Sequence, residues 1–172
     1  IVDNLITGRL KNINNFLDKE RVFFYKGDVC DRNFFKKLED QMFDVIYHLA
    51  SPASPPQYFK YRIETLLTNS QGTYNTLEFF RKKRGGIFIF ASTSEVYGNP
   101  LKHPQSETYW GNVNPVGDRS CYDESKRFGE TLCVNYFKKY SLDIRIARIF
   151  NTYGPNMEKD DGRVISNFIT LA

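Results

Sequence analysis

The sequence contains 172 residues, 41% of them hydrophobic and 16% aromatic, which is enough to bury the core of one globular domain. Its 24 basic and 20 acidic residues give a formal net charge of +4 and are interspersed along the chain. This even mixture argues against a nucleic-acid-binding protein, and no run of about eighteen apolar residues is present to span a membrane.

Cysteine and histidine are too few and too scattered to predict a metal site. The three cysteines, Cys30, Cys121 and Cys133, form no CxxC pair, and the histidines are His48 and His103. We expect structural histidines and free thiols in a reducing compartment, the cytoplasm. No secretory leader lies within the sequence given. If an anchor precedes it, the Golgi lumen is the alternative compartment.

The first part of the chain predicts strands that alternate with helices. Residues 1–4 have the pattern of a strand end, and residues 9–20 form a polar, helix-like segment after a turn. Residues 21–27 predict a second strand, and residues 33–41 predict a helix with one apolar stripe that Asp31 can cap. Because the sequence starts within a strand pattern and without methionine, we expect it to be an excerpt of a longer chain.

The alternation continues through the middle of the chain. Residues 43–50 are nearly all apolar, as expected of a parallel strand that is covered on both faces. The prolines within residues 51–56 predict a loop at the carboxyl end of this strand. A long helix is expected over residues 61–84, where the basic residues 81–84 complement the helix dipole. Residues 86–92 predict the next buried strand.

The last part completes the pattern. Residues 97–120 are rich in proline and glycine and predict a long loop, which ends where a helix that carries Tyr122 begins. Residues 141–150 predict a strand, and residues 151–155 a turn. The order β-α-β-α-β-α-β-α-β therefore predicts an α/β fold, a doubly wound parallel sheet of Rossmann-like type with right-handed crossovers.

Several short segments lie at the carboxyl ends of the expected strands, which is where such sheets bind ligands. They are Asp3, Asp28, and residues 49–51, 92–95 and 151–154. An acidic residue at the end of the second strand of a Rossmann unit binds the adenosine ribose of NAD, and Asp3 has that position if another strand precedes it. The Gly-rich pyrophosphate loop is not within these residues.

A tyrosine and a lysine predict oxidation of an alcohol. Tyr122 and Lys126 are four residues apart and lie on one helical face, while Ser94 and Glu95 follow a predicted strand. A nearby cation favours the phenolate and lowers the pKa of the tyrosine, which makes Tyr122 a candidate general base. The alternative for this common spacing is a packed ring beside a solvated amine.

Seven segments carry a family resemblance: VDNLITG, GDVCD, HLASPASPPQY, ASTSEVYGNPLKHPQSETYWGNVNP, CYDESKRFGET, RIARIFNTYGP and DGRVISNFI. As a set they resemble the extended short-chain dehydrogenase/reductase family of nucleotide-sugar enzymes, and within it the UDP-glucuronic acid decarboxylases. The resemblance implies a partial NAD-binding Rossmann domain over residues 1–172 that lacks the first strand and the Gly-rich loop. A substrate domain would only begin near residues 155–172.

The resemblance also implies residue roles. Tyr122 would be the catalytic base and Lys126 its partner, and Thr93, Ser94 and Glu95 would face the sugar. NAD would contact both Tyr122 and Lys126 and also Asp3, Asn4, Thr7, Gly8, Asp28, Val29, Leu49, Ser51, Thr68, Ala91 and Thr152. The UDP-sugar would contact Tyr58, Glu95, Asn151, Arg163 and Asn167.

The implied reaction is decarboxylation of UDP-glucuronate. Tyr122 would take the C4 hydroxyl proton while NAD takes the C4 hydride, and the ketone, β to the C6 carboxylate, would lose CO2 to leave an enolate. Reprotonation of the enolate and return of the hydride would then give UDP-xylose and regenerate NAD. The dTDP-glucose 4,6-dehydratases carry an aspartic acid where Ser94 stands, as the acid that expels the C6 hydroxyl, so Ser94 favours decarboxylation. Dehydration or epimerisation of a nucleotide sugar is the alternative activity. Leu67 replaces an expected lysine, which leaves the exact nucleotide sugar open. Ser125 replaces a frequent glycine, a change that we expect to be mild on a helix.

Two further expectations concern assembly. The resemblance suggests a homodimer that packs the helix over residues 61–84 and the helix with Tyr122 against their symmetry mates. The alternative of another class is a truncated, non-catalytic fragment, because a Rossmann sheet without its central first strand has two unpaired interior edges.

Overall fold

The computed structural model describes residues 1–17, 21–83, 85–158 and 160–172 of the chain. Within these residues every strand pair is parallel, and the strands form two separate sheets. The smaller sheet pairs β1 with β2, and the larger has the order β3-β4-β5. The strands are β1 (Val2–Asp3), β2 (Tyr25–Lys26), β3 (Val45–His48), β4 (Ile87–Thr93) and β5 (Ile144–Ile149).

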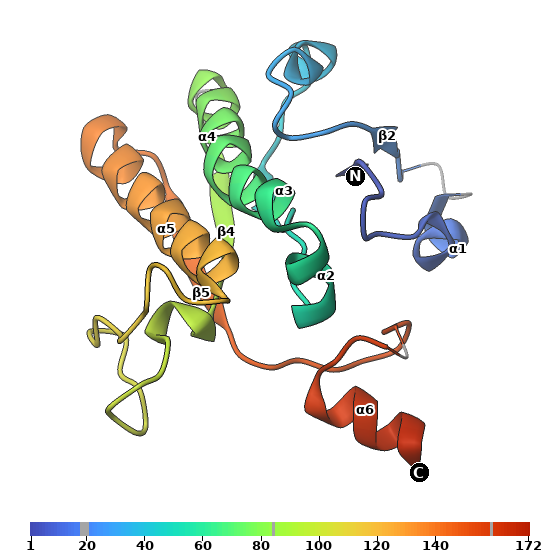
Figure 1. Ribbon diagram of the computed structural model, residues 1–172. Coiled ribbons are helices and arrows are strands. Elements are labelled where there is room, and N and C mark those ends of the chain that lie inside the picture. The colour runs from blue at the N-terminus through green and yellow to red at the C-terminus, as the bar shows by residue number, and fades with distance from the viewer. Residues whose placement is uncertain (18–20, 84, 159) are drawn as a thin grey trace.

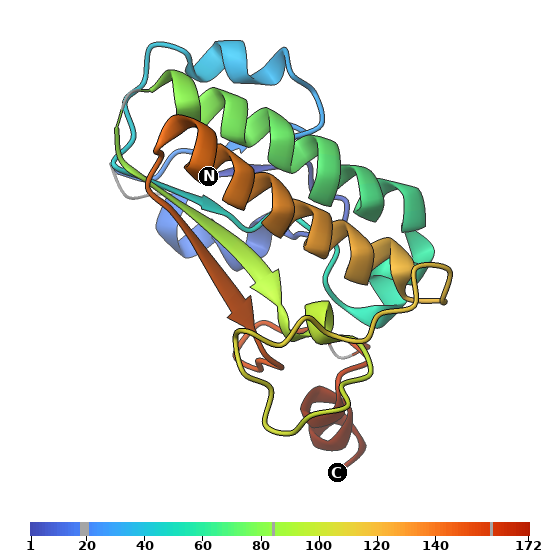
Figure 2. The ribbon, with the colours of Figure 1, turned by 90° about the vertical axis from the view of Figure 1, so that its left-hand side faces the viewer.

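Helices cover one face of the larger sheet. α4 and α5 lie side by side, α4 against β3 and α5 against β4 and β5, and α3 leads into α4 (Figures 1 and 2). The α-helices are α1 (Asn14–Leu17), α2 (Pro55–Lys60), α3 (Arg62–Leu67), α4 (Thr73–Lys82), α5 (Ser120–Tyr140) and α6 (Val164–Leu171). The 3-10 helices are η1 (Leu10–Asn12), η2 (Phe34–Leu38) and η4 (Ser94–Tyr97), and η3 (Thr68–Gly72) is a π-helix.

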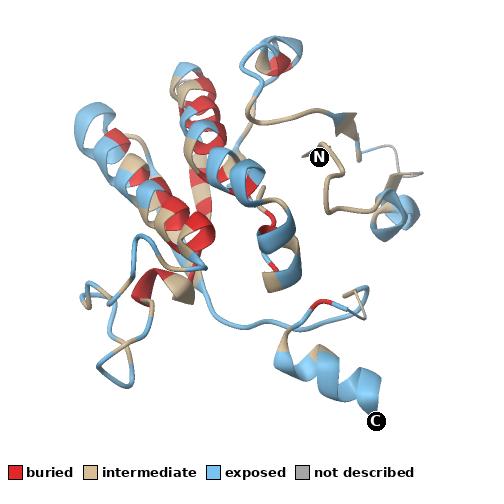
Figure 3. Cartoon of the chain, viewed as in Figure 1, coloured by how far each residue is buried: buried red, intermediate tan, exposed pale blue. Residues whose placement is uncertain are grey.

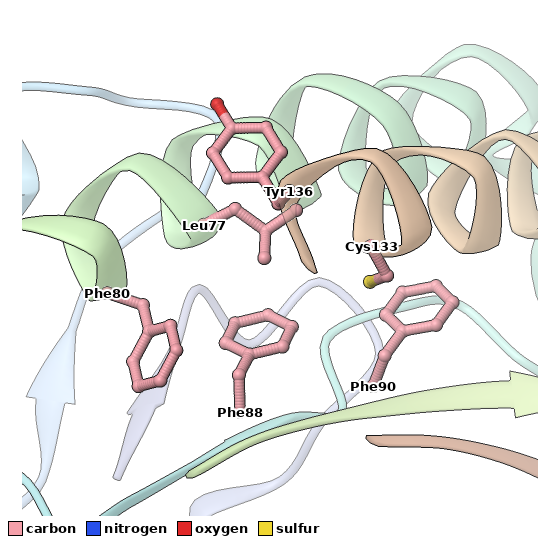
Figure 4. Packing of buried hydrophobic residues seen from close by; sticks show 6 residues of the cluster. All are labelled: Leu77, Phe80, Phe88, Phe90, Cys133 and Tyr136. Atoms are coloured by element: carbon pink, nitrogen blue, oxygen red, sulfur yellow. The ribbon is translucent and has the colours of Figure 1, made fainter. Parts of the chain in front are cut away.

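The main core lies between β4 and the two long helices (Figures 3 and 4). Alternate residues of β4 point toward the helices, so Phe88 and Phe90 are fully buried. Gly129 of α5 packs directly over Phe90, where a Cβ would lie 2.4 Å from the ring, so only glycine permits this close approach. The cluster consists of Leu77, Phe80, Phe88, Phe90, Cys133 and Tyr136.

The predicted parallel α/β architecture of Rossmann-like type is confirmed, but one expectation about its layers is wrong. Residues 43–50 were expected to form a strand covered on both faces. Within the described chain no helix covers the second face of β3, and Tyr47 on that face is 63% exposed. A nearly all-apolar composition therefore did not correctly predict that both faces of β3 are buried.

The amino-terminal elements are shorter than predicted. The strand predicted over residues 21–27 pairs only at Tyr25–Lys26, because β1 supplies just two partners. The helix predicted over residues 33–41 is instead the 3-10 helix η2. Asp31 lies before it, and its carboxylate accepts a hydrogen bond from the backbone amide of Asn33, the N-cap residue, at 2.9 Å. The segment predicted over residues 9–20 forms η1 and α1, and residues 18–20 lie outside the described part of the chain.

The long helix predicted over residues 61–84 is interrupted. α3 and α4 are joined by η3, a π-helical turn that accommodates one extra residue per turn, and Arg84 lies outside the described residues. The loop predicted over residues 51–56 ends earlier than expected, because α2 begins at Pro55 and its first turn tolerates proline. The sequence patterns did not predict α6.

Candidate functional site

Tyr122 and Lys126 are buried at the amino-terminal end of α5. The Tyr122 ring is 6% exposed and stacks on Tyr58, with 5.0 Å between the ring centroids and an angle of 10° between the planes. Lys126 is 3% exposed, and its Nζ donates a hydrogen bond to the Ala91 carbonyl at 2.8 Å. The lysine is therefore not the solvated amine of an ordinary amphipathic helix.

The expected lowering of the Tyr122 pKa by Lys126 is not found. Burial raises the pKa of Tyr122, and the hydrogen-bonding contact with Thr93 opposes this only in part. Lys126 lies 5.9 Å from the centroid of the Tyr122 ring and directs its ammonium group to a backbone carbonyl. Burial also lowers the pKa of Lys126 to about 8. In this conformation Tyr122 is held as the neutral phenol.

The residues predicted to face the sugar lie at the carboxyl end of β4. Thr93 caps η4, because its Oγ1 accepts a hydrogen bond from the Glu95 amide at 3.2 Å. The Glu95 carboxylate forms an ion pair with Arg119, and their side chains are 24% and 46% exposed. Ser94 is the first residue of η4 and lies between Thr93 and Glu95. Sequence reasoning missed Arg119, which carries no motif signal of its own.

Two buried polar atoms beside Tyr122 have no hydrogen-bond partner among the described residues. They are the hydroxyl oxygen of Tyr58 and Oδ1 of Asp123, and the two residues are 1% and 7% exposed, respectively. Burial raises the pKa of Asp123 to about 6, against the opposing charge of Arg119. Asp123 was not predicted as a site residue, although it directly follows Tyr122 in the sequence. Unpaired buried atoms of this kind are expected where a ligand completes the hydrogen bonding.

Most of the predicted cofactor residues meet at one cavity. It has a volume of about 530 Å³ and lies between the open edges of β1 and β3. Asp28 lies beside Asn4 there, whose Nδ2 donates to the Asp28 carboxylate at 3.0 Å. Gly8 lies close by, because a Cβ added to it would come within 2.9 Å of the Asp3 carboxylate. The predicted cofactor residues that line the cavity are Asp3, Asn4, Thr7, Asp28, Val29, Leu49, Ser51 and Thr68.

The remaining predicted residues lie elsewhere. Asn151 and Thr152 are exposed on the segment that follows β5, and Asn167 is exposed on α6. Arg163 precedes α6 and is ion-paired with Asp161. The structure thus gathers the catalytic group and most of the cofactor group. Of the predicted nucleotide-sugar residues, Tyr58 and Glu95 lie beside Tyr122, whereas Asn151, Arg163 and Asn167 do not line the cavity.

His48 is the structural histidine that the sequence predicted. Its Nε2 lies 2.9 Å from Thr73 Oγ1, and burial, assisted by the charge of Lys126, lowers the pKa of His48 to about 3. His103 is exposed and contacts Gln105.

The depressed pKa of His48 predicts acid sensitivity. An unfolded histidine gains a proton as the pH falls below about 6.5, whereas His48 in the folded state stays neutral to about pH 3. Between pH 7 and pH 5 this one group should lower the free energy of unfolding by about 2 kcal/mol. Thermal unfolding at both pH values should show a smaller acid loss for His48→Gln. The exposed His103→Gln should behave like the wild type, and an equal acid loss in His48→Gln would contradict the assignment.

The fold and this site together define a class of protein: a Rossmann-like nucleotide-binding domain with a buried Tyr-Lys pair beside the end of a central strand. The chain belongs to the NAD dependent epimerase/dehydratase family, whose family model matches residues 2–172. It is 50% identical over 172 residues to UDP-glucuronic acid decarboxylase 1 of Xenopus tropicalis, covering 100% of this chain and 39% of that protein. It is also 49% identical over 172 residues to UDP-glucuronic acid decarboxylase 6 of Arabidopsis thaliana, covering 100% of this chain and 48% of that protein.

Solved structures of related enzymes share the fold. The dTDP-glucose 4,6-dehydratase of Streptomyces venezuelae, with NAD bound, superposes with a TM-score of 0.82 at 27% identity, covering 98% of this chain and 50% of that one. The UDP-glucose 4-epimerase of Thermotoga maritima superposes with a TM-score of 0.83 at 26% identity, covering 97% and 52%.

The chain spans 39% and 48% of the length of the two curated relatives described above. Among the residues that the structure describes, no helix is long and apolar enough to cross a membrane. The same residues contain no cluster of histidine, cysteine and acidic side chains suited to a metal ion.

Proposed function

We propose that the full-length protein decarboxylates UDP-glucuronate to UDP-xylose through a 4-keto intermediate, with NAD as a tightly bound cofactor. The observation that carries the proposal is the buried Tyr122–Lys126 pair beside a turn that presents Ser94 and Glu95. The identity of about half of all residues with UDP-glucuronic acid decarboxylases supports the choice of substrate.

The cavity between β1 and β3 suits NAD at its polar rim. Asp3 and Asp28 offer carboxylates for the hydroxyl groups of the adenosine ribose and for the adenine. Thr68, on the π-helical turn, and Ser51 add hydroxyl groups to the same rim. Bound NAD would supply reversible hydride transfer, accepting a hydride from sugar C4 and returning it at the end of the cycle. Gly8, Ala91 and Thr152 remain proposed contacts outside the cavity lining.

The chain's own residues would move the protons and orient the sugar. Tyr122 would accept the proton of the C4 hydroxyl, and Lys126 would stabilise the resulting phenolate. Ser94, together with Thr93, would orient the same hydroxyl. A ketone at C4 is β to the C6 carboxylate, so CO2 leaves without an acid at that position. Because Ser94 is not a strong proton donor, loss of water from C6 would be disfavoured.

The nucleotide-sugar end of the substrate is proposed to contact Tyr58, Asn151, Arg163 and Asn167, with Glu95 at the sugar. Tyr58 has a free buried hydroxyl beside Tyr122, which supports its place next to the reacting ring. The other three lie after β5, where the substrate region would begin at residues 155–172.

The same cavity supports the proposed domain organisation. Its lining includes the apolar side chains Phe35, Leu38, Phe43 and Ile46, and it lies between two strand edges that pair with no other strand in the described chain. An additional central strand that carries a Gly-rich loop would fill this gap and join both sheets into one. We therefore propose that residues 1–172 are part of an NAD-binding domain.

We also propose a homodimer in the cytoplasm. α3 and α5 expose Ile63, Leu66, Phe128 and Phe137 on the outer surface of the helical layer, and pairing with a second copy would bury them. Leu67, which stands where a lysine was expected, is also exposed on α3. The three free cysteines fit a reducing compartment.

The decisive test is product analysis. Purified full-length protein incubated with UDP-glucuronate should release CO2 and form UDP-xylose, without added NAD if the cofactor stays bound. Formation of only a 4-keto-6-deoxy product from dTDP-glucose would show a dehydratase instead. If the protein neither turns over a nucleotide sugar nor is thermally stabilised by NAD, the non-catalytic alternative holds.

A further inference from the structure

A charge pair lies directly beneath the proposed catalytic turn. Arg148 of β5 donates from Nε to one carboxylate oxygen of Glu130 at 2.9 Å and from Nη2 to the other at 2.8 Å. The two side chains are 26% and 14% exposed, and they connect β5 to α5. A bidentate pair of this kind fixes both the distance and the orientation of its two partners.

This pair holds both ends of the segment that carries Thr93, Ser94 and Glu95. On the amino-terminal side, the hydroxyl of Ser92 donates to Glu130 Oε1 at 2.6 Å. On the carboxyl-terminal side, Arg148 Nη1 donates to the hydroxyl of Tyr97 at 2.9 Å, and the guanidinium lies 4.9 Å from the centroid of the Tyr97 ring.

The pair also holds the long loop that follows the turn. Arg148 Nη1 donates to the Glu107 carbonyl at 3.0 Å. The neck of the loop closes between Gly98 and Asn112, and Gly98 is required there because its φ is 61° and a Cβ would lie 2.2 Å from the Asn112 carbonyl. Arg127 of α5 adds a second attachment, because Nη1 donates to the Trp110 carbonyl at 2.8 Å.

Helical spacing ties this arrangement to the proposed base. Tyr122, Lys126 and Glu130 follow one another at intervals of four residues and so lie along one side of α5. Arg127, one residue after Lys126, donates to the Val96 carbonyl at 2.9 Å within the turn itself. The same helix therefore presents the proposed base and holds the turn with Ser94 and Glu95.

We propose that Glu130 and Arg148 are positioning residues that set the distance between Tyr122 and the Ser94–Glu95 turn and hold residues 98–112 beside it. This role rests on the proposed decarboxylation, because the reacting sugar would lie between the turn and the phenol. Loss of the bidentate pair leaves every catalytic side chain in place but loosens the geometry between them, and misplacement by about 1 Å can reduce a rate by about 100-fold.

The test uses Arg148→Lys in the full-length protein. Lysine keeps the charge but cannot form the fork to Glu130 while also reaching Tyr97 and Glu107. The matched control is Arg145→Lys, on the same strand, whose guanidinium is exposed and, among the residues that the structure describes, pairs with Asp143 alone at 3.3 Å. Two quantities are measured: steady-state kinetics with UDP-glucuronate, and amide hydrogen exchange over residues 92–112.

We expect kcat of Arg148→Lys to fall by about 10- to 100-fold, with KM changed less than about threefold. Exchange over residues 92–112 should become faster, while NAD-induced thermal stabilisation should match that of the wild type. Glu130→Gln, which keeps shape and polarity, should show the same pattern more weakly. The control Arg145→Lys should change neither quantity.

Unchanged exchange and unchanged kcat in Arg148→Lys would overturn the proposal. So would a fall in kcat that merely follows a lowered fraction of folded protein, since that reports a structural role only. If the wild type does not turn over UDP-glucuronate, the proposed function fails. In that case the exchange measurement still decides whether Arg148 holds the turn and the loop.

Discussion

We expect Tyr122→Phe to lower kcat on UDP-glucuronate by about 1,000-fold in the full-length protein, because it removes the oxygen atom proposed to accept the C4 hydroxyl proton. The ring itself remains and keeps its stack on Tyr58 at 5.0 Å. The folded structure and the affinity for NAD should therefore be preserved. Kinetics of product formation and NAD-induced thermal shifts measure the two effects separately.

The pH dependence of the wild type should identify the same group. Burial raises the pKa of Tyr122, so the fraction of phenolate, and with it kcat/KM, should increase as the pH rises from about 6 to about 9. The residual activity of Tyr122→Phe should lack this increase. Tyr140→Phe, which removes a phenol hydroxyl at the other end of α5, is the matched control and should behave as the wild type does. Retention of more than a tenth of wild-type kcat in Tyr122→Phe would refute the assignment.

Lys126→Met should produce a protein that is more stable and much less active. Burial lowers the pKa of Lys126 from 10.5 to about 8, so keeping this lysine charged at pH 7 costs the folded state about 3 kcal/mol. Methionine removes that cost but also the hydrogen bond to the Ala91 carbonyl, which contributes about 1 kcal/mol. We expect a net gain of about 1 to 2 kcal/mol in the free energy of unfolding.

The activity of Lys126→Met should fall by about 100-fold or more, because the phenolate of Tyr122 loses its cation. The sign of the stability effect has its own test. The cost of the charged lysine is fully present below pH 8 and disappears as the pH rises toward 10.5, so the stability advantage of the variant should shrink over that interval. Lys139→Met, at the carboxyl-terminal end of α5, serves as the control. A variant that is both less stable and fully active would show that Lys126 is only a packing residue.

Periodicity and strand composition predicted the elements that position the site. β4 and α5 were both expected, because the apolar run of residues 86–92 and the end of the loop rich in proline and glycine before Tyr122 depend only on local sequence. The π-helical turn η3 was not predicted, because one extra residue in a helix leaves no periodic signature. The two-residue length of β2 likewise depends on its partner strand and not on its own composition.

The residue types that meet at the site were predicted from the sequence, but the direction of the Tyr122 pKa shift was not. The motif around Tyr122 and Lys126 specified which residue types come together, and the structure places them beside Thr93. The direction of the Tyr122 pKa could not be predicted, because it depends on how far burial outweighs the neighbouring charge. The pairing of Glu95 with Arg119 spans a long loop, so only the closed tertiary structure brings the two together.

α5 also determines where the length of this protein can change. Each residue added to an α-helix rotates everything after it by about 100°, so one insertion between Tyr122 and Glu130 would turn the anchoring carboxylate away from the side that carries the base. The tip of the loop between Asn99 and Gly111 is less constrained, because the neck closes through backbone contacts and the side-chain attachments of the loop are at the Glu107 and Trp110 carbonyls. Insertions and deletions among relatives of this chain should therefore accumulate at the tip of that loop and be absent from the first three turns of α5.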